Sequence, residues 1–382
     1  MGSRRMRITI VHSFYRKSVP SGENQVVLGQ CQALKNFGHE VTLIDASTDE
    51  DKLGIFFSLS SSIRVITGLG PPGARTITSQ NADILHVHNT FPNVGWRGLV
   101  QWPGPLVHTL HNFRPMCSAA TLFRDGAPCH DCMGHIPTAA IRHGCYGGSR
   151  LKTIPLAIRN SVPPNRQGLL RRADALIVGS EMGRSKYLAA GVPRQRLHVI
   201  PNGIGVASSQ APPNRGRFGW VVAARLDAAK GVLELLEDWP KDQPLDVYGS
   251  GPLEEVVAAS CNGQTSFKGS VALEDLRKRL TTARGLIIPS RWPEMNPTIV
   301  SEALAQGTPI IAYHVNTAAE VVERFDIGAT YSNARTLVQA LNDVADRQFS
   351  LHERNRAIYE SEYTYEVWVA RLETLYRKLL QS

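Results

Sequence analysis

Two short apolar runs, separated by a proline-containing loop and a helix, constrain the fold of this chain most. Gly285–Ile288 and Ile310–Ala312 are typical of buried strands. The segment between them predicts a helix that opens at Pro297 and Thr298 and stops at Gly307. A strand, a helix and a second strand in this order form the crossover unit of a parallel sheet. The sequence therefore predicts an α/β fold.

Two glutamates lie inside this unit. Glu294 is in the predicted loop, and Glu302 follows eight positions later inside the predicted helix. Both carboxylates are therefore expected at the carboxyl end of the sheet, where open α/β folds bind their ligands. Carboxylate oxygens accept hydrogen bonds from the vicinal hydroxyls that a sugar or a ribose offers.

The same alternation runs along the whole chain and predicts two wound parallel sheets. Residues 24–36 have helical spacing, 207–215 form a polar, proline-containing linker, and 351–380 predict one long amphipathic closing helix. The predicted strands are 7–11, 40–44, 82–87, 105–110, 175–178 and 198–200 before the linker, and 219–224, 245–248, 265–267, 285–288 and 309–313 after it.

Two cations follow the first predicted strand of the second half. Arg225 and Lys230 lie between a strand end and a helix start. Free backbone amides and the helix dipole favour anions at such a position. Two cations there would neutralise a diphosphate leaving group as its bond to a sugar breaks.

The segment from Pro289 to Pro309 resembles the Glu-x7-Glu motif of the retaining GT-B glycosyltransferases of family 4. A Pro-Ser strand end precedes Glu294, and Glu-Ala and then Gly-x-Pro follow from Glu302 onwards. The likeness extends from Ile8 to about Leu379. It implies two Rossmann-like domains that face each other across a cleft. The implied domains are an acceptor domain over 1–206 with a cysteine-rich insertion at 112–150, a nucleotide-sugar domain over 207–362, and a terminal helix over 363–382 that crosses back to the first domain.

The resemblance also implies roles for individual residues. Glu294 would contact the donor sugar, Glu302 the ribose, and Arg225 and Lys230 the diphosphate. His111, just past a predicted strand, would donate a hydrogen bond to the reacting sugar. His88 is a second candidate for the cleft, whereas His86 and His108 are expected to pack locally. The implied donor-binding residues are Gly22, Gly249, Gly251, Lys268, Met295, Asn296, Pro297, Thr298 and Glu302.

Four of the six cysteines gather in one loop-rich stretch, at Cys117, Cys129, Cys132 and Cys145. In a reducing compartment this spacing favours a structural zinc site. His130, His135 or His143 could replace one ligand. Reduced free thiols, disulfides and an iron–sulfur cluster remain open alternatives. Cys31 and Cys261 are isolated and are expected to be small buried residues.

Composition sets the broad class. The 382 residues exceed one typical core and predict two domains, and no apolar stretch is long enough to span a bilayer. The basic N-terminus leads into a strand-like run rather than a signal-peptide core, which predicts a cytoplasmic protein. The net charge of +9 favours anionic partners, and peripheral contact with an anionic membrane stays open. The cluster Arg277–Arg279 is expected to be a solvated basic surface.

These observations predict a retaining glycosyltransferase that moves a sugar from a nucleotide-diphosphate sugar, with a UDP-sugar as the expected donor, to an acceptor hydroxyl without a catalytic metal. The products would be polysaccharides, glycolipids or natural products. A nucleotide-sugar epimerase of the same fold and a zinc-containing nucleic-acid-binding protein are the alternatives. The second is disfavoured because the aromatic residues are not clustered with the basic ones.

Overall fold

The computed structural model describes residues 5–15, 21–48, 55–206 and 217–381. The predicted linker at 207–215 lies outside the described residues. The chain divides into two compact units. The first contains residues 1–122, 129–203 and 365–382, and the second contains 123–128 and 204–364. Within the described ranges, no helix is both long and apolar enough to cross a membrane.

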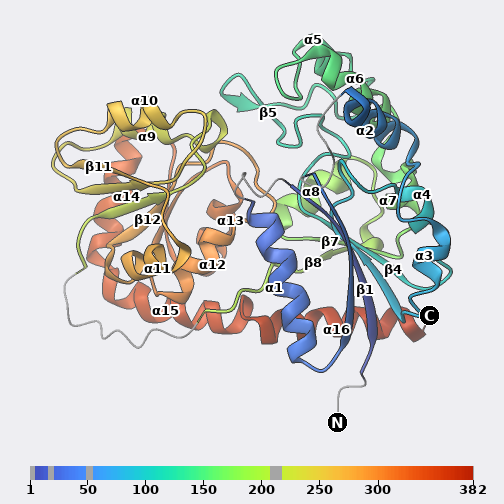
Figure 1. Ribbon diagram of the computed structural model, residues 1–382. Helices are drawn as coiled ribbons and strands as arrows, with labels where there is room; N and C mark the ends of the chain where they lie inside the picture. The colour runs from blue at the N-terminus through green and yellow to red at the C-terminus, as the bar shows by residue number, and fades with distance from the viewer. Residues whose placement is uncertain (1–4, 16–20, 49–54, 207–216, 382) are drawn as a thin grey trace. The chain divides into compact units, whose positions relative to one another are not determined.

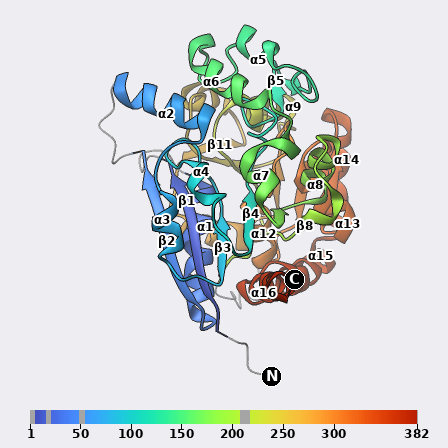
Figure 2. The same cartoon turned by 90° about the vertical axis from the view of Figure 1, so that its right-hand side faces the viewer.

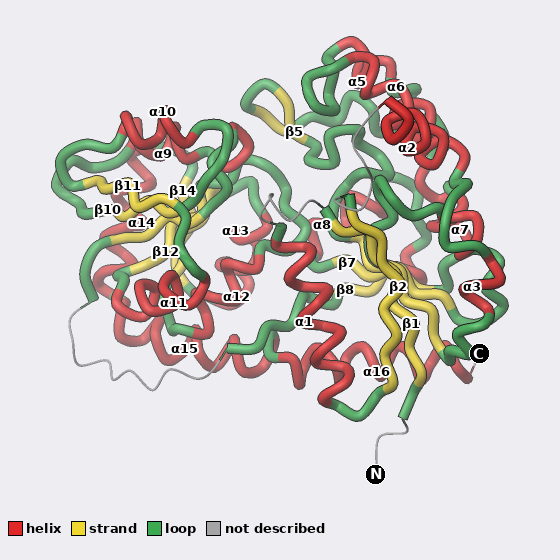
Figure 3. Tube along the Cα trace, viewed as in Figure 1, coloured by secondary structure: helices red, strands yellow, loops and turns green. Residues whose placement is uncertain are grey.

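The first unit is built on a six-stranded parallel sheet in the order β2-β1-β3-β4-β7-β8 (Figure 3). Strands β3, β4 and β7 are buried at every position, as expected for parallel strands covered on both faces. The strands are β1 (Arg7–Phe14), β2 (Glu40–Ser47), β3 (Ile84–Val87), β4 (Leu106–Leu110), β7 (Ala175–Val178) and β8 (Leu197–Val199).

Helices flank this sheet. The hydroxyl of Ser21 accepts a hydrogen bond from the backbone N–H of Asn24 and caps α1. α16 packs against α1 (Figure 1), and its Trp368, Leu372 and Tyr376 join the core beneath the sheet. α2 lies beside α6 (Figure 2). The helices are α1 (Gly22–Asn36), α2 (Ile55–Thr67), α3 (Ala74–Thr78), α4 (Trp96–Leu99), α5 (Thr138–Arg142), α6 (Arg150–Asn160), α7 (Gly168–Arg172), α8 (Glu181–Ala189) and α16 (Tyr365–Gln381), with 3₁₀ turns η1 (Pro164–Arg166) and η2 (Arg194–Arg196).

The second unit has its own six-stranded parallel sheet, in the order β11-β10-β9-β12-β13-β14. Counted along the chain this is 3-2-1-4-5-6, the Rossmann order. Two apolar cores, one on each face, hold the sheet between its helices. The elements are β9 (Trp220–Ala223), β10 (Leu245–Tyr248), β11 (Thr265–Gly269), β12 (Gly285–Ile288), β13 (Ile310–Tyr313), β14 (Gly328–Tyr331), η3 (Ala228–Lys230), α9 (Val232–Asp238), α10 (Glu254–Ser260), α11 (Leu273–Thr282), α12 (Thr298–Ala305), α13 (Thr317–Phe325), α14 (Ala334–Asp346) and α15 (Gln348–Glu362).

The predicted single closing helix over 351–380 is wrong. The structure has two helices, α15 and α16, separated at Tyr363 and Thr364. The carbonyl of Tyr363 accepts a hydrogen bond from the backbone N–H of Ile204 at 2.9 Å, and Thr364 forms a parallel bridge with Ile204. The helix ends there because its backbone pairs with a distant segment instead.

Two further elements were not predicted. β14 is short and half-buried, so its sequence lacks a continuous apolar run. A small antiparallel pair, β5 (Phe123–Arg124) and β6 (Ala127–Pro128), lies within the cysteine-rich stretch. By contrast, the predicted strand–loop–helix–strand unit is confirmed: α12 begins at Thr298 and Gly307 follows it with φ +63°.

Candidate functional site

The strand order of the second unit reverses between its neighbouring strands β9 and β12. In open α/β sheets this switch point is where ligands bind. Arg225 and Lys230 follow β9, and Glu294 follows β12. Lys230 Nζ lies 2.9 Å from Glu294 Oε1, so the two loops meet at the switch point through an ion pair. The structure thus brings Lys230 and Glu294, two sequence-predicted site residues, into direct contact.

Glu294 is held in place by the loop around it. The hydroxyl of Ser290 donates to its Oε1, and the hydroxyl of Thr317 donates to its backbone carbonyl. The side-chain amide of Asn316 donates to the carbonyls of Ile288 and Ser290, at 3.1 and 2.9 Å, which ties the end of β12 to the start of α13. The carboxylate is therefore nearly buried, rigid and neutralised by one cation.

The two cations differ in exposure. The Lys230 side chain is 19% exposed, and its ammonium also lies 5.3 Å from the centre of the Trp292 ring. The Arg225 side chain is 57% exposed, and its Nε lies 3.5 Å from Asp227 Oδ2. Asp227 also caps η3 by accepting from the backbone N–H of Ala229. Lys230 is thus paired with Glu294, whereas more than half of the Arg225 side chain is accessible to solvent.

Glu302 already has a partner in this structure. Arg277 on α11 donates through Nε and Nη2 to the two carboxylate oxygens, at 2.7 and 3.0 Å. The hydrogen bond to Glu302 raises the pKa of the Arg277 guanidinium. A carboxylate has about four lone-pair positions, so it can hold Arg277 and still accept from another hydroxyl. The proposed ribose contact of Glu302 stays a prediction, and Arg277 is the residue that orients it.

The glycine turn after β10 packs against the Arg225 loop. A Cβ on Gly249 would lie 1.9 Å from the carbonyl oxygen of Ala224, and a Cβ on Gly251 would lie 2.5 Å from that of Leu226. Both glycines have φ above +140°. The turn therefore supports the Arg225 loop through close backbone packing, a role that the sequence pattern did not distinguish from ligand contact.

The other predicted donor-site residues are distributed over several elements, and some of them follow Glu294 directly. Met295 is buried, and Asn296 Nδ2 is a buried donor without a partner in the described structure. Pro297 and Thr298 form the start of α12. Lys268 Nζ lies 3.4 Å from Asp246 Oδ1. Gly22, in the first unit, is the first residue of α1.

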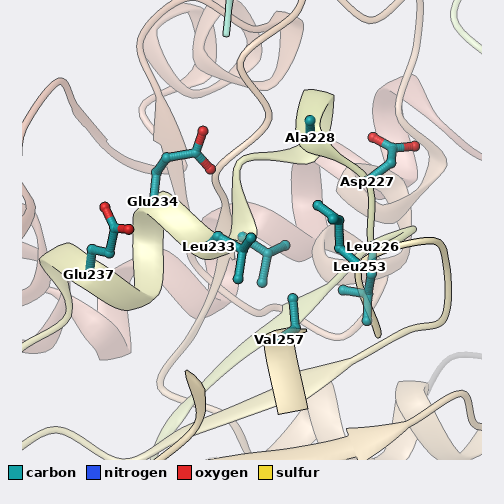
Figure 4. Close-up of a pocket in the computed structure, with 9 residues that line it drawn as sticks. Leu226, Asp227, Ala228, Leu233, Glu234, Glu237, Leu253 and Val257 are labelled. Atoms are coloured by element: carbon teal, nitrogen blue, oxygen red, sulfur yellow. The ribbon is translucent and has the colours of Figure 1, made fainter. Parts of the chain in front are cut away.

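A separate pocket of about 260 Å³ lies behind the Arg225 loop (Figure 4). Leucine and valine side chains from the loop, α9 and α10 form its wall, and Glu234 and Glu237 lie along α9 beside it. None of the predicted donor-site residues lines this pocket. Its acidic rim suits a nucleotide diphosphate poorly.

The predicted histidine His111 lies just past β4 in the first unit and is partly exposed. Its Nε2 is 2.9 Å from Nδ1 of buried His88. Burial and the neighbouring histidines lower the pKa of both rings well below the usual value. The expected local roles of the other two are confirmed: His86 contacts the hydroxyls of Tyr376 and Thr109, and His108 donates to the His88 carbonyl.

A polar group beside these histidines was missed. Glu23, in the first turn of α1, lies near the side-chain amides of Asn89 and Asn112, which directly follow His88 and His111. Burial raises the pKa of Glu23 to about 7, although Arg114 and the two amides act in the opposite direction. Glu23 Oε1 has no partner among the described residues. A lone glutamate after a glycine gives no sequence signal of such burial.

None of the four clustered cysteines forms a disulfide within the described residues. Burial, and to a lesser extent the nearby thiols of Cys117, Cys145 and Cys129, raise the pKa of Cys132 to about 11. Within the described part of the chain, no group of three or more His, Cys, Asp or Glu side chains is arranged to hold a metal ion. The zinc site therefore stays a prediction. Cys31 is buried as expected, and Cys261 is partly exposed.

The basic cluster at 277–279 is only partly the solvated surface that was expected. Lys278 is exposed, but Arg277 pairs with Glu302, and Arg279 Nε lies 2.8 Å from Asp246 Oδ2. α11 directs these two side chains towards acidic residues of neighbouring elements. Charge spacing alone does not show which cations of a helix face inward.

Two family models match the chain. The model for Glycosyltransferase Family 4 matches residues 20–207, and that for Glycosyl transferases group 1 matches residues 209–363. The chain belongs to glycosyltransferase family 4. This family 4 enzyme is 24% identical over 355 residues to the phosphatidyl-myo-inositol mannosyltransferase of Mycolicibacterium smegmatis, an alignment that covers 85% of this chain and 80% of that protein.

Solved structures show the same GT-B fold. Sucrose-phosphate synthase from Thermosynechococcus elongatus is similar with a TM-score of 0.70 and 19% identity, covering 99% of this glycosyltransferase and 100% of that chain. HepE of Anabaena in complex with UDP is similar with a TM-score of 0.60 and 15% identity, covering 97% and 99% of the two chains.

Proposed function

We propose that this family 4 glycosyltransferase transfers a hexose from a UDP-sugar to an acceptor hydroxyl with retention of the anomeric configuration. The second unit would bind the donor and the first the acceptor. The acceptor would be a glycan, a lipid-linked intermediate or a natural product. The UDP complex of HepE supports the choice of nucleotide, and the mannosyltransferase relative supports a hexosyl donor. We infer a cytoplasmic site of action, and the net charge of +9 supports peripheral contact with an anionic membrane.

The observation that carries this proposal is the Lys230–Glu294 ion pair at the switch point, with Arg225 beside it. A diphosphate placed there would meet one largely buried, ion-paired cation and one exposed cation, which would neutralise its charge as the sugar leaves. Glu294 would accept hydrogen bonds from the sugar hydroxyls. These side chains provide the charge neutralisation that other glycosyltransferases obtain from a divalent ion. Transfer should therefore proceed without added metal.

The test is turnover of donor variants. Arg225→Ala and Lys230→Ala should each lower turnover about 100-fold or more, which corresponds to roughly 3 kcal/mol of transition-state stabilisation. Release of UDP from a panel of UDP-hexoses gives the assay without a known acceptor, and proton NMR of the released sugar reports its anomeric configuration. Lys241→Ala, at an exposed position of the same unit, is the control. Near-normal turnover in both variants would contradict the proposal that the donor binds at the switch point.

A further inference from the structure

Five histidines gather at the carboxyl ends of β1, β3 and β4 in the first unit. Four of them are buried and one is partly exposed. His86 stacks on His88 with ring centres 4.3 Å apart, and His88 stacks on His111 at 5.1 Å. The group consists of His12, His86, His88, His108 and the partly exposed His111.

For two histidines of this cluster, the hydrogen-bond partner determines the tautomer. His12 Nε2 faces the amide oxygen of Asn24 at 3.1 Å, and His108 Nε2 faces the carbonyl oxygen of His88 at 3.0 Å. Oxygens of this kind only accept, so both Nε2 atoms carry the proton. The remaining nitrogen of each ring, Nδ1, is a bare lone pair, is buried and has no partner in the described structure. In this cluster the orphaned nitrogen is therefore an acceptor, not an N–H.

For His88, too, the question is which ring nitrogen carries the proton. Its Nδ1 bonds to His111 Nε2 at 2.9 Å, and its Nε2 is buried and unpartnered within the described residues. If Nδ1 accepted the bond, Nε2 would be a buried N–H without an acceptor, which folded proteins avoid more strictly than an unused lone pair. If Nδ1 donates, only a bare lone pair is left, as at His12 and His108.

We propose that His88 is a positioning residue that donates its Nδ1–H to Nε2 of His111 and thereby places the proton of His111 on Nδ1. Burial lowers the pKa of both rings, so both are neutral near pH 7 and the bond needs no added proton. His86, held by Tyr376 and Thr109, stacks on His88 and restrains its rotation.

This tautomer would make Nδ1 of His111 a hydrogen-bond donor that is available to a ligand. Nδ1 of His111 has no partner among the described residues, and the ring is partly exposed. With the proton on Nδ1, His111 offers an N–H rather than a lone pair to an incoming hydroxyl oxygen. This step rests on the proposed function and on the role that the family resemblance implies for His111, a hydrogen bond to the reacting sugar. The tautomer itself is a property of the free protein.

The test is nitrogen NMR of ¹⁵N-histidine-labelled enzyme near pH 7.5, with His111→Gln used to assign the His111 signals. In the wild-type protein, Nδ1 of His111 should be protonated and Nε2 bare. His88→Leu should release the constraint and shift His111 towards the proton on Nε2, whereas His88→Asn, which keeps a side-chain N–H donor, should preserve the wild-type pattern. His39→Gln changes a buried histidine that bonds to Glu373 outside the cluster, and it should leave His111 unchanged.

The wild-type spectrum alone can overturn the proposal, because a proton on Nε2 of His111 excludes donation by His88. An unchanged pattern in a folded His88→Leu variant would do the same. For catalysis, His88→Leu should lower kcat about tenfold or more with little change in KM for the donor, and His88→Asn should restore part of it. An Nδ1 proton in an enzyme that releases no UDP from any donor would refute the proposed function and leave the tautomer assignment standing.

Discussion

Replacing Glu302 with alanine should destabilise the second unit as well as weaken nucleotide binding. The Glu302 side chain is 7% exposed and the Arg277 side chain 19%, and two hydrogen bonds join them. Removing one partner leaves a charge without compensation in a site that water barely reaches. Such losses typically cost about 3–5 kcal/mol.

The lower end of that range applies, since Arg277 keeps some contact with water and lies 3.8 Å from Glu274. A loss of about 3 kcal/mol in a unit of this size lowers the melting temperature by roughly 6–12 °C. Replacing both partners, as Arg277→Met with Glu302→Leu, removes both buried charges and should recover most of the loss.

Thermal unfolding followed by near-ultraviolet circular dichroism measures the effect, with urea unfolding as a second estimate. Lys278→Ala is the matched control on the same helix. Its ion pair with Asp275 is 3.2 Å long, but both side chains are exposed, so the change should be under about 1 kcal/mol. If Glu302→Ala melts within 2 °C of the wild type, roughly a 1 kcal/mol effect at most, the argument that Arg277 and Glu302 form a stabilising pair is refuted.

Three further predictions follow from other groups. Glu294→Ala should abolish most sugar transfer but leave the affinity for free UDP nearly unchanged, as measured by calorimetry; a large loss of UDP affinity would contradict its role at the sugar. Glu23 has a folded-state pKa of about 7 against 4.5 for an ordinary glutamate, so folding binds a proton between these values and stability falls as pH rises through them. Glu23→Gln should therefore be more stable than the wild type at pH 8, by up to the order of 3 kcal/mol, and no more stable at pH 4.5, which urea unfolding at both pH values would show. If the four clustered cysteines bind zinc, metal analysis should give about one equivalent per chain and Cys129→Ser should lose it and melt earlier; four titratable thiols in a metal-free protein would refute the zinc site.

The elements around the switch point could be predicted because their signals are local. The apolar run at 285–288, the prolines of the following loop and the glycine after α12 each constrain the backbone without help from distant residues. The same is true of the cations that follow β9. Their residue types and their place after a strand led to the prediction of an anion site, which stays a prediction.

Contacts between residues that are distant in the sequence could not be predicted from such local signals. The pairing of Tyr363 and Thr364 with Ile204 interrupts an otherwise helical pattern. Arg277 meets Glu302 only because α11 packs beside α12. Glu23 becomes partly buried because the loops after β3 and β4 bring Asn89 and Asn112 to it. In each case the partner is set by the packing of the sheet and its helices, which single-sequence periodicity does not encode.

Paired calorimetric titrations of UDP and uridine, with GDP and guanosine run in parallel, test the proposed diphosphate site after β9 most directly. UDP should bind at least about tenfold more tightly than uridine, because the diphosphate meets Arg225 and Lys230. Arg225→Ala and Lys230→Met should remove most of that advantage while leaving nucleoside binding unchanged. Equal affinities for diphosphate and nucleoside in the wild-type enzyme, or an advantage that survives both substitutions, would contradict the proposed donor site.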